Sequence, residues 1–98
     1  MDDVIQSSGI VRIPVDVVMK AFKQHPESTC ALDALSEIHG MRTHESYSSF
    51  ACRKLGVSLG YAWGVMSGWD EQSYGYEEYN GYQEGYEDGQ LFRQAAGR

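Results

Sequence analysis

A chain of 98 residues with 42% hydrophobic and 12% aromatic side chains can form one domain with a modest core, and this composition excludes wholesale disorder. Its formal net charge of −6 disfavours direct contact with nucleic acid or a bare anionic membrane. The acidic excess lies in the last third, where residues 70–98 hold seven acidic and two basic side chains, against seven and six in residues 1–69.

The N-terminal part of the chain predicts a lead-in and two short helices. Residues 1–13 are expected to be an extended or frayed lead-in. Apolar side chains then recur at three- and four-residue steps through residues 14–40, which indicates two amphipathic helices. Pro14 suits the first turn of one helix, Ser28 or Thr29 can cap the other, and Gly40 is placed to end it.

Residues 44–96 predict a long helical hairpin. Its first helix is expected from about His44, after Thr43 as cap, to Trp69, and its second from roughly Tyr76 to Ala96. The polar residues 70–75 suit the turn between them. The fold class is therefore all-α, a small helical bundle in a single domain over residues 1–98. One unbroken helix pairing with a second chain is a geometric alternative.

Glycine recurs every fourth residue in this hairpin, and seven of the eleven glycines fall on two such registers. Residues four apart lie on one helix face. Each helical glycine costs roughly 0.8–1 kcal/mol relative to alanine, so close approach of a second backbone has to offset the cost. Such a glycine zipper packs either within the chain or between two chains. The predicted helix-packing or dimer residues are Gly56, Gly60, Gly64, Gly68, Gly81, Gly85 and Gly89.

The repeated Gly-Tyr-x-x unit of residues 81–89 resembles the helical glycine repeats of the flagellar export-ATPase regulator family. The similarity covers about a tenth of the chain, and it implies helical self-association without implying a function. The alternative of a flexible low-complexity tail over residues 73–89 is disfavoured by the strict glycine spacing.

The sequence contains side chains that can bind metal or act in catalysis, but they do not occur in the spacings that such sites use. Potential zinc ligands do not form the usual paired units such as C-x2-C or H-x3-H, and His39 and His44, five residues apart, lie across a predicted break. No phosphate-binding glycine motif occurs. The two short helices are joined by a proline-containing break and the second lacks basic residues, which disfavours a helix-turn-helix DNA reader. We expect no enzyme activity, no cofactor and no metal site. The metal ligands considered are His25, Cys30, His39, His44 and Cys52.

The N-terminal residues and the small number of cysteines predict a cytoplasmic location. The first residues are acidic with no apolar segment after them, so no secretory signal is predicted, and two cysteines make no disulfide framework. The uncharged run 55–69 has fifteen residues, fewer than the about 20 needed to span a bilayer. We predict no membrane span.

Tyrosines interleave with carboxylates in the last third of the chain. Tyrosine offers a large contact area at low entropic cost, so this cluster can bind a partner, although the same rings could also pack internally. The predicted partner-binding residues are Trp69, Asp70, Glu71, Tyr74, Tyr76, Glu77, Glu78, Tyr79, Tyr82, Glu84, Tyr86, Glu87 and Asp88.

These features predict a non-catalytic protein-binding module. An acidic, tyrosine-rich face suits a basic surface on another protein. Because nucleic-acid-handling proteins carry such surfaces, the function we expect is a small inhibitor of phage or mobile-element type that covers one of them. The alternative is a homodimeric structural or assembly protein that associates through its glycine stripes.

Overall fold

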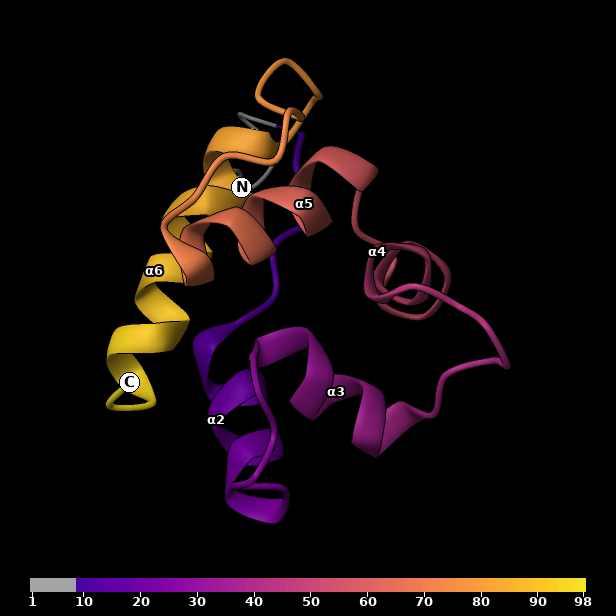
Figure 1. Ribbon diagram of the computed structural model, residues 1–98, viewed down its shortest axis with the longest axis vertical. Coiled ribbons are helices and arrows are strands. Elements are labelled where there is room, and N and C mark those ends of the chain that lie inside the picture. The colour runs from indigo at the N-terminus through magenta and orange to yellow at the C-terminus, as the bar shows by residue number, and fades with distance from the viewer. Residues whose placement is uncertain (1–8) are drawn as a thin grey trace.

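The chain folds into helices, as the sequence predicts. The computed structural model describes residues 9–98, and in that range it holds five α-helices, one π-helical segment and no strand (Figure 1). The all-α class is thereby confirmed. In chain order the elements are α2 (Val15–Gln24), α3 (Ala31–His39), α4 (Tyr47–Phe50), the π-helix η1 (Ala51–Leu55), α5 (Leu59–Asp70) and α6 (Tyr82–Ala95).

The lead-in is anchored by its apolar residues. Residues 10–13 have no regular secondary structure, yet Ile10 and Ile13 are buried in the core, so this part of the chain is not frayed. The part of the predicted lead-in that comprises residues 1–8 lies outside the described residues.

The two short helices have close to their predicted bounds. Pro14 immediately precedes α2, and Gly40 ends α3 with a φ of 82°, a conformation that glycine adopts without strain. The predicted cap of α3 was wrong by one or two positions, because the thiol of Cys30 takes that place and accepts a hydrogen bond from the backbone N–H of Asp33 at 3.4 Å.

The third predicted helix is interrupted. It does not run unbroken from His44 to Trp69, because Gly56 ends η1 in the left-handed conformation at a φ of 72°. A serine caps the N-terminus of the helix before this break and of the helix after it. Ser46 caps α4, and Ser58 caps α5 by accepting a hydrogen bond from the N–H of Tyr61 at 3.0 Å. One helix therefore ends at Leu55 and the next, α5, begins at Leu59 and packs on α6.

The fourth predicted helix starts later than expected. Residues 76–80 form turns, and α6 begins only after Gly81, whose φ of 91° is left-handed. The connection from α5 to α6 therefore covers residues 71–81, and it lies at the top of the view in Figure 1.

The core joins all the helices around α5. Tyr61, Ala62 and Val65 are almost completely buried, and they pack in one cluster with apolar residues of α2, α3, α4 and α6. The radius of gyration of 12.6 Å is close to the about 13 Å of a compact chain of 100 residues. No helix within residues 9–98 has the length and apolar character needed to cross a membrane.

Candidate functional site

Helices α5 and α6 meet backbone against backbone. A Cβ added at Gly64 would lie 2.3 Å from the carbonyl oxygen of Tyr82, and one at Gly85 would lie 2.2 Å from that of Tyr61, whereas ordinary contacts lie at 3.4–4 Å. Only glycine permits this separation. Backbone atoms of the same chain lie equally close to three further glycines of these helices, Gly60, Gly68 and Gly89.

The remaining two glycines of the predicted packing set do not line these helix faces. Gly56 has open space around its Cβ position, so its packing role is wrong and its left-handed φ explains the residue. Gly81 precedes α6 rather than lying inside a helix. A Cβ there would lie 2.6 Å from the hydroxyl of Ser58, which itself donates to the carbonyl of Asn80 at 2.9 Å.

Asp88 is part of an internal network, so its prediction as a partner-binding residue was wrong. Its side chain accepts hydrogen bonds from Arg12 at 2.8 and 3.0 Å and from the Tyr61 hydroxyl at 2.6 Å. The same hydroxyl accepts from the N–H of Ile13 at 2.9 Å. This network fastens the lead-in to both α5 and α6, because Arg12 and Ile13 of the lead-in bind Asp88 of α6 and Tyr61 of α5.

Two aromatic residues of the predicted partner-binding set are also interior. Trp69 is only 6% exposed and stacks on Phe22 with ring centroids 5.6 Å apart, while Tyr82 is 7% exposed. Both therefore belong to the fold rather than to a binding face.

An exposed surface remains between the two helices, in the segment we call the acidic tyrosine loop (residues 70–80). Its carboxylates are all exposed, as are two of its tyrosines, and the segment contains no basic residue. The exposed tyrosines are Tyr74 at 39% and Tyr79 at 49%. The exposed carboxylates are those of Asp70, Glu71, Glu77 and Glu78.

Aromatic stacking on α5 holds the acidic tyrosine loop in place. Trp63 stacks flat on Tyr76, with centroids 4.3 Å apart and an interplanar angle of 4°. Tyr79 meets the edge of Tyr76 at 5.1 Å, and Tyr74 lies 5.8 Å from Trp63. Trp63 is absent from the predicted site residues, although its position one residue before Gly64 places it beside the glycine register.

The remaining predicted residues lie on α6 and are less accessible or already engaged. Glu84 and Tyr86 are half-buried. Glu87 is exposed, and it accepts hydrogen bonds from Arg12 at 3.4 Å and from Gln83 at 3.2 Å. The free acidic surface is thus concentrated in the acidic tyrosine loop.

The two arginines of the last third line a small cavity with Glu71, but their hydrogen bonds go to main-chain carbonyls rather than to the carboxylates of this loop. Arg93 donates to the carbonyl of Trp69 at 2.6 Å. Arg98 donates to the carbonyls of Ser28 and Pro26, and its guanidinium lies 4.5 Å from the ring centroid of Phe22. Both cations are used to hold the fold together.

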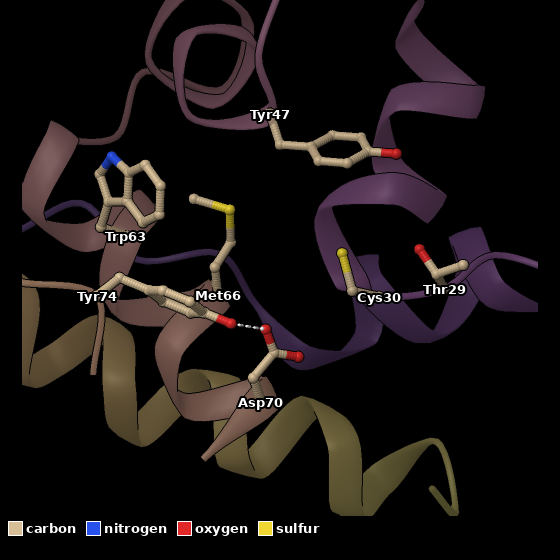
Figure 2. Close-up of a pocket in the computed structure, with 7 residues that line it drawn as sticks. All are labelled: Thr29, Cys30, Tyr47, Trp63, Met66, Asp70 and Tyr74. Carbon is tan, nitrogen blue, oxygen red and sulfur yellow. Dashed lines mark hydrogen bonds between the residues drawn. The ribbon is translucent and has the colours of Figure 1, made fainter. Parts of the chain in front are cut away.

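A cavity of about 270 Å³ opens beside the acidic tyrosine loop. A second cavity of about 450 Å³ shares three of its walls, Tyr47, Trp63 and Met66. In the first cavity the Tyr74 hydroxyl donates to Asp70 at 2.6 Å (Figure 2). The residues lining this first cavity are Thr29, Cys30, Tyr47, Trp63, Met66, Asp70 and Tyr74.

Burial raises the pKa of two further groups of this region, which are neutral at physiological pH. It raises the pKa of the Cys30 thiol, and together with a hydrogen bond to Asp33 it raises the pKa of Tyr47 to about 12. Tyr47 and Cys30 therefore present a neutral ring and a neutral thiol to the first cavity.

Alkaline pH is expected to destabilise the fold through its buried tyrosines. Burial, with a hydrogen bond to Asp88, also raises the pKa of Tyr61 above its ordinary value. Unfolded tyrosines lose their protons near pH 10, so above pH 10 the folded chain binds more protons and its stability falls as pH rises. Denaturant unfolding at pH 8 to 11 should show this loss, with a shallower slope for Tyr61→Phe. Exposed Tyr79→Phe is the control and should keep the native slope; equal slopes for both variants would contradict the assignment.

The potential metal ligands lie apart in the fold. Across residues 9–98, no three histidine, cysteine or acidic side chains converge in a way that could hold a metal ion. Cys30 and Cys52 are free thiols, and Cys30 lines the first cavity as a helix cap.

Comparisons of the chain with models of protein families, with curated proteins and with solved structures find no match.

Proposed function

We propose that this protein is a non-catalytic protein-binding module whose acidic tyrosine loop docks on a basic surface of another protein. The observation that carries the proposal is a fixed, exposed segment with four carboxylates, exposed tyrosine rings and no basic residue. Carboxylates steer the approach of a cationic partner, and tyrosine rings supply contact area once it has docked.

The fixed position of the loop favours binding. A flexible segment loses conformational entropy when it is ordered by a partner, and that loss weakens binding. Here the stacking of Tyr76 on Trp63 orders the loop in advance. In this proposal α5 and α6 form a glycine-faced hairpin, the rigid frame on which Trp63 and the loop are mounted.

The class of partner that we propose is a nucleic-acid-handling protein. Such proteins expose cationic surfaces that neutralise phosphates, and a row of carboxylates can occupy the same surface. The module would then act as a small cytoplasmic inhibitor of phage or mobile-element type, by covering that surface.

A charge-exchange experiment tests the proposal. The native chain, immobilised on a resin and incubated with host-cell lysate, should retain a basic protein at low salt and release it at high salt. The double variant Glu77→Lys with Glu78→Lys should retain about tenfold less of this protein, because it reverses the charge of the loop.

The matched control exchanges two exposed glutamates outside the loop, Glu27→Lys with Glu37→Lys. It alters the net charge by the same amount and should retain the partner. The proposal fails if both double variants lose the partner equally, or if retention is independent of salt.

The alternative function, a homodimer formed through the glycine stripes, has less support. Gly60, Gly64, Gly68, Gly85 and Gly89 already face the backbone of their own chain at distances that leave no room for another helix. A second chain could use them only if α5 and α6 separated.

A further inference from the structure

We propose that the cavity beside the acidic tyrosine loop binds an arginine side chain of the partner. This inference rests on the proposed function and assigns the anchor of the interaction. The cavity combines aromatic walls, a carboxylate at its edge and a volume suited to one side chain.

Aromatic rings surround the centre of this cavity on several sides. Figure 2 shows Met66 in the middle, with Trp63 and Tyr74 on one side of it, Tyr47 above and Cys30 on the other side. Aromatic rings attract a cation electrostatically when it lies within about 6 Å of the ring centroid. Thioether and thiol groups add polarisable, weakly polar surface that does not compete for hydrogen bonds.

Charge at the edge of the cavity favours a cation. Asp70 lines it together with the aromatic rings, and none of the lining residues is basic. The Tyr74 hydroxyl donates to Oδ2 of Asp70, and a carboxylate has lone pairs for further donors on both oxygens. Within residues 9–98, Asp70 forms no ion pair.

The second cavity differs in this respect. Its carboxylate, Glu45, already binds Arg53 through two hydrogen bonds of 2.8 Å, which hold the pKa of Glu45 at about 2. An incoming cation would have to displace that internal arginine. The cavity that contains Asp70 is therefore the one available to a cationic ligand.

Arginine fits this cavity better than lysine. A guanidinium is planar and weakly hydrated, so it stacks on rings and is removed from water at lower cost than an ammonium. It also binds a carboxylate through two parallel hydrogen bonds. The volume of about 270 Å³ is below the roughly 300–1,000 Å³ of cavities that hold drug-sized ligands, which suits a single side chain.

An NMR titration with N-acetyl-arginine methylamide tests this assignment on the full chain. The indole N–H signal of Trp63 should shift and saturate, whereas that of Trp69, stacked on Phe22 in the core, should stay in place as an internal control. The neutral citrulline analogue has nearly the same shape without the charge and should produce no saturable shift. The lysine analogue should bind more weakly.

A pair of variants locates the carboxylate involved. Asp70→Asn should weaken arginine binding by about tenfold, because it removes a charge-assisted hydrogen bond. Glu27→Gln removes an exposed carboxylate that lies outside both the acidic tyrosine loop and the cavity lining, and it should leave binding unchanged. Circular dichroism of each variant establishes that the fold is retained.

The possible failures are distinguishable. Absence of a saturable Trp63 shift, or equal binding of the arginine and citrulline analogues, overturns the arginine site. If the charge-exchange experiment on Glu77 and Glu78 succeeds in that case, the protein-binding function stands without this anchor. Equal binding of the lysine analogue overturns the preference for arginine.

Discussion

Replacement of Gly64 by alanine is expected to lower the free energy of unfolding by at least about 3 kcal/mol. The added methyl group would lie 2.3 Å from a carbonyl oxygen and 2.8 Å from a backbone nitrogen of α6. These are main-chain atoms, so they cannot move aside as the end of a flexible side chain can. The helices would have to separate and lose the packing that offsets the cost of their glycines. Denaturant unfolding followed by circular dichroism measures the effect.

Gly56→Ala is the matched control for this prediction. Space around Gly56 is open, and only its left-handed φ of 72° opposes a side chain, which costs about 1–2 kcal/mol. Gly56→Asn should cost less, because asparagine tolerates this conformation. If Gly64→Ala unfolds at the same denaturant concentration as the native chain, the close contact is wrong.

Light scattering of the native chain gives an independent check on the glycine contacts. Contacts made within the chain predict the mass of one 11.0 kDa protomer. A dimer that becomes a folded monomer in Gly64→Leu would instead place the glycine contact between chains. The two measurements together separate loss of folding from loss of association.

The predictable part of this fold follows from local signals. The bounds of α2 and α3 agree with apolar residues at three- and four-residue steps, bounded by Pro14 and Gly40. The break before α5 was missed because Gly56 continues the four-residue glycine spacing, so it resembles a packing residue. Ser58 was the available signal, since a glycine followed two residues later by a helix-capping serine marks the end of one helix and the start of another.

The turns before α6 were missed for a different reason. Tyr76, Tyr79 and Tyr82 are three residues apart, a spacing that imitates a helix face. Stacking of Tyr76 on Trp63, a contact between segments distant in sequence, holds residues 76–80 in turns instead. The dipeptide Asn80-Gly81 was the only local sign of a turn.

The acidic charge of the candidate site could be predicted from the sequence, whereas the three-dimensional arrangement of its residues could not. The concentration of acidic residues and tyrosines predicted a wider partner-binding set, from Trp69 to Asp88, and the acidic tyrosine loop is one part of that stretch. The cavity was not predictable, because its walls come from segments far apart, with Cys30 before α3, Tyr47 in α4 and Trp63 in α5. In the sequence Asp88 cannot be distinguished from the exposed acidic residues around it. Its burial depends on Arg12, which lies 76 residues away.

Replacement of Asp88 by alanine is expected to lower the free energy of unfolding by about 3 kcal/mol. The side chain of Asp88 is 11% exposed, and its loss would leave the guanidinium of Arg12 and the hydroxyl of Tyr61 without their shared acceptor. Because Arg12 is 34% exposed and water can partly replace the carboxylate, the loss falls at the lower end of the about 3–5 kcal/mol that a fully buried pair would cost.

Glu87→Ala is the natural control, since it removes the same charge from the adjacent residue. Glu87 also contacts Arg12, at 3.4 Å, but its side chain is 56% exposed, so its loss should cost no more than about 0.5 kcal/mol. Adding Arg12→Ala to each variant separates the pairs, and the coupling of Arg12 to Asp88 should reach about 1–3 kcal/mol. Equal effects of Asp88→Ala and Glu87→Ala would contradict the network, because Asp88 is more deeply buried, makes shorter hydrogen bonds to Arg12 and also accepts one from Tyr61.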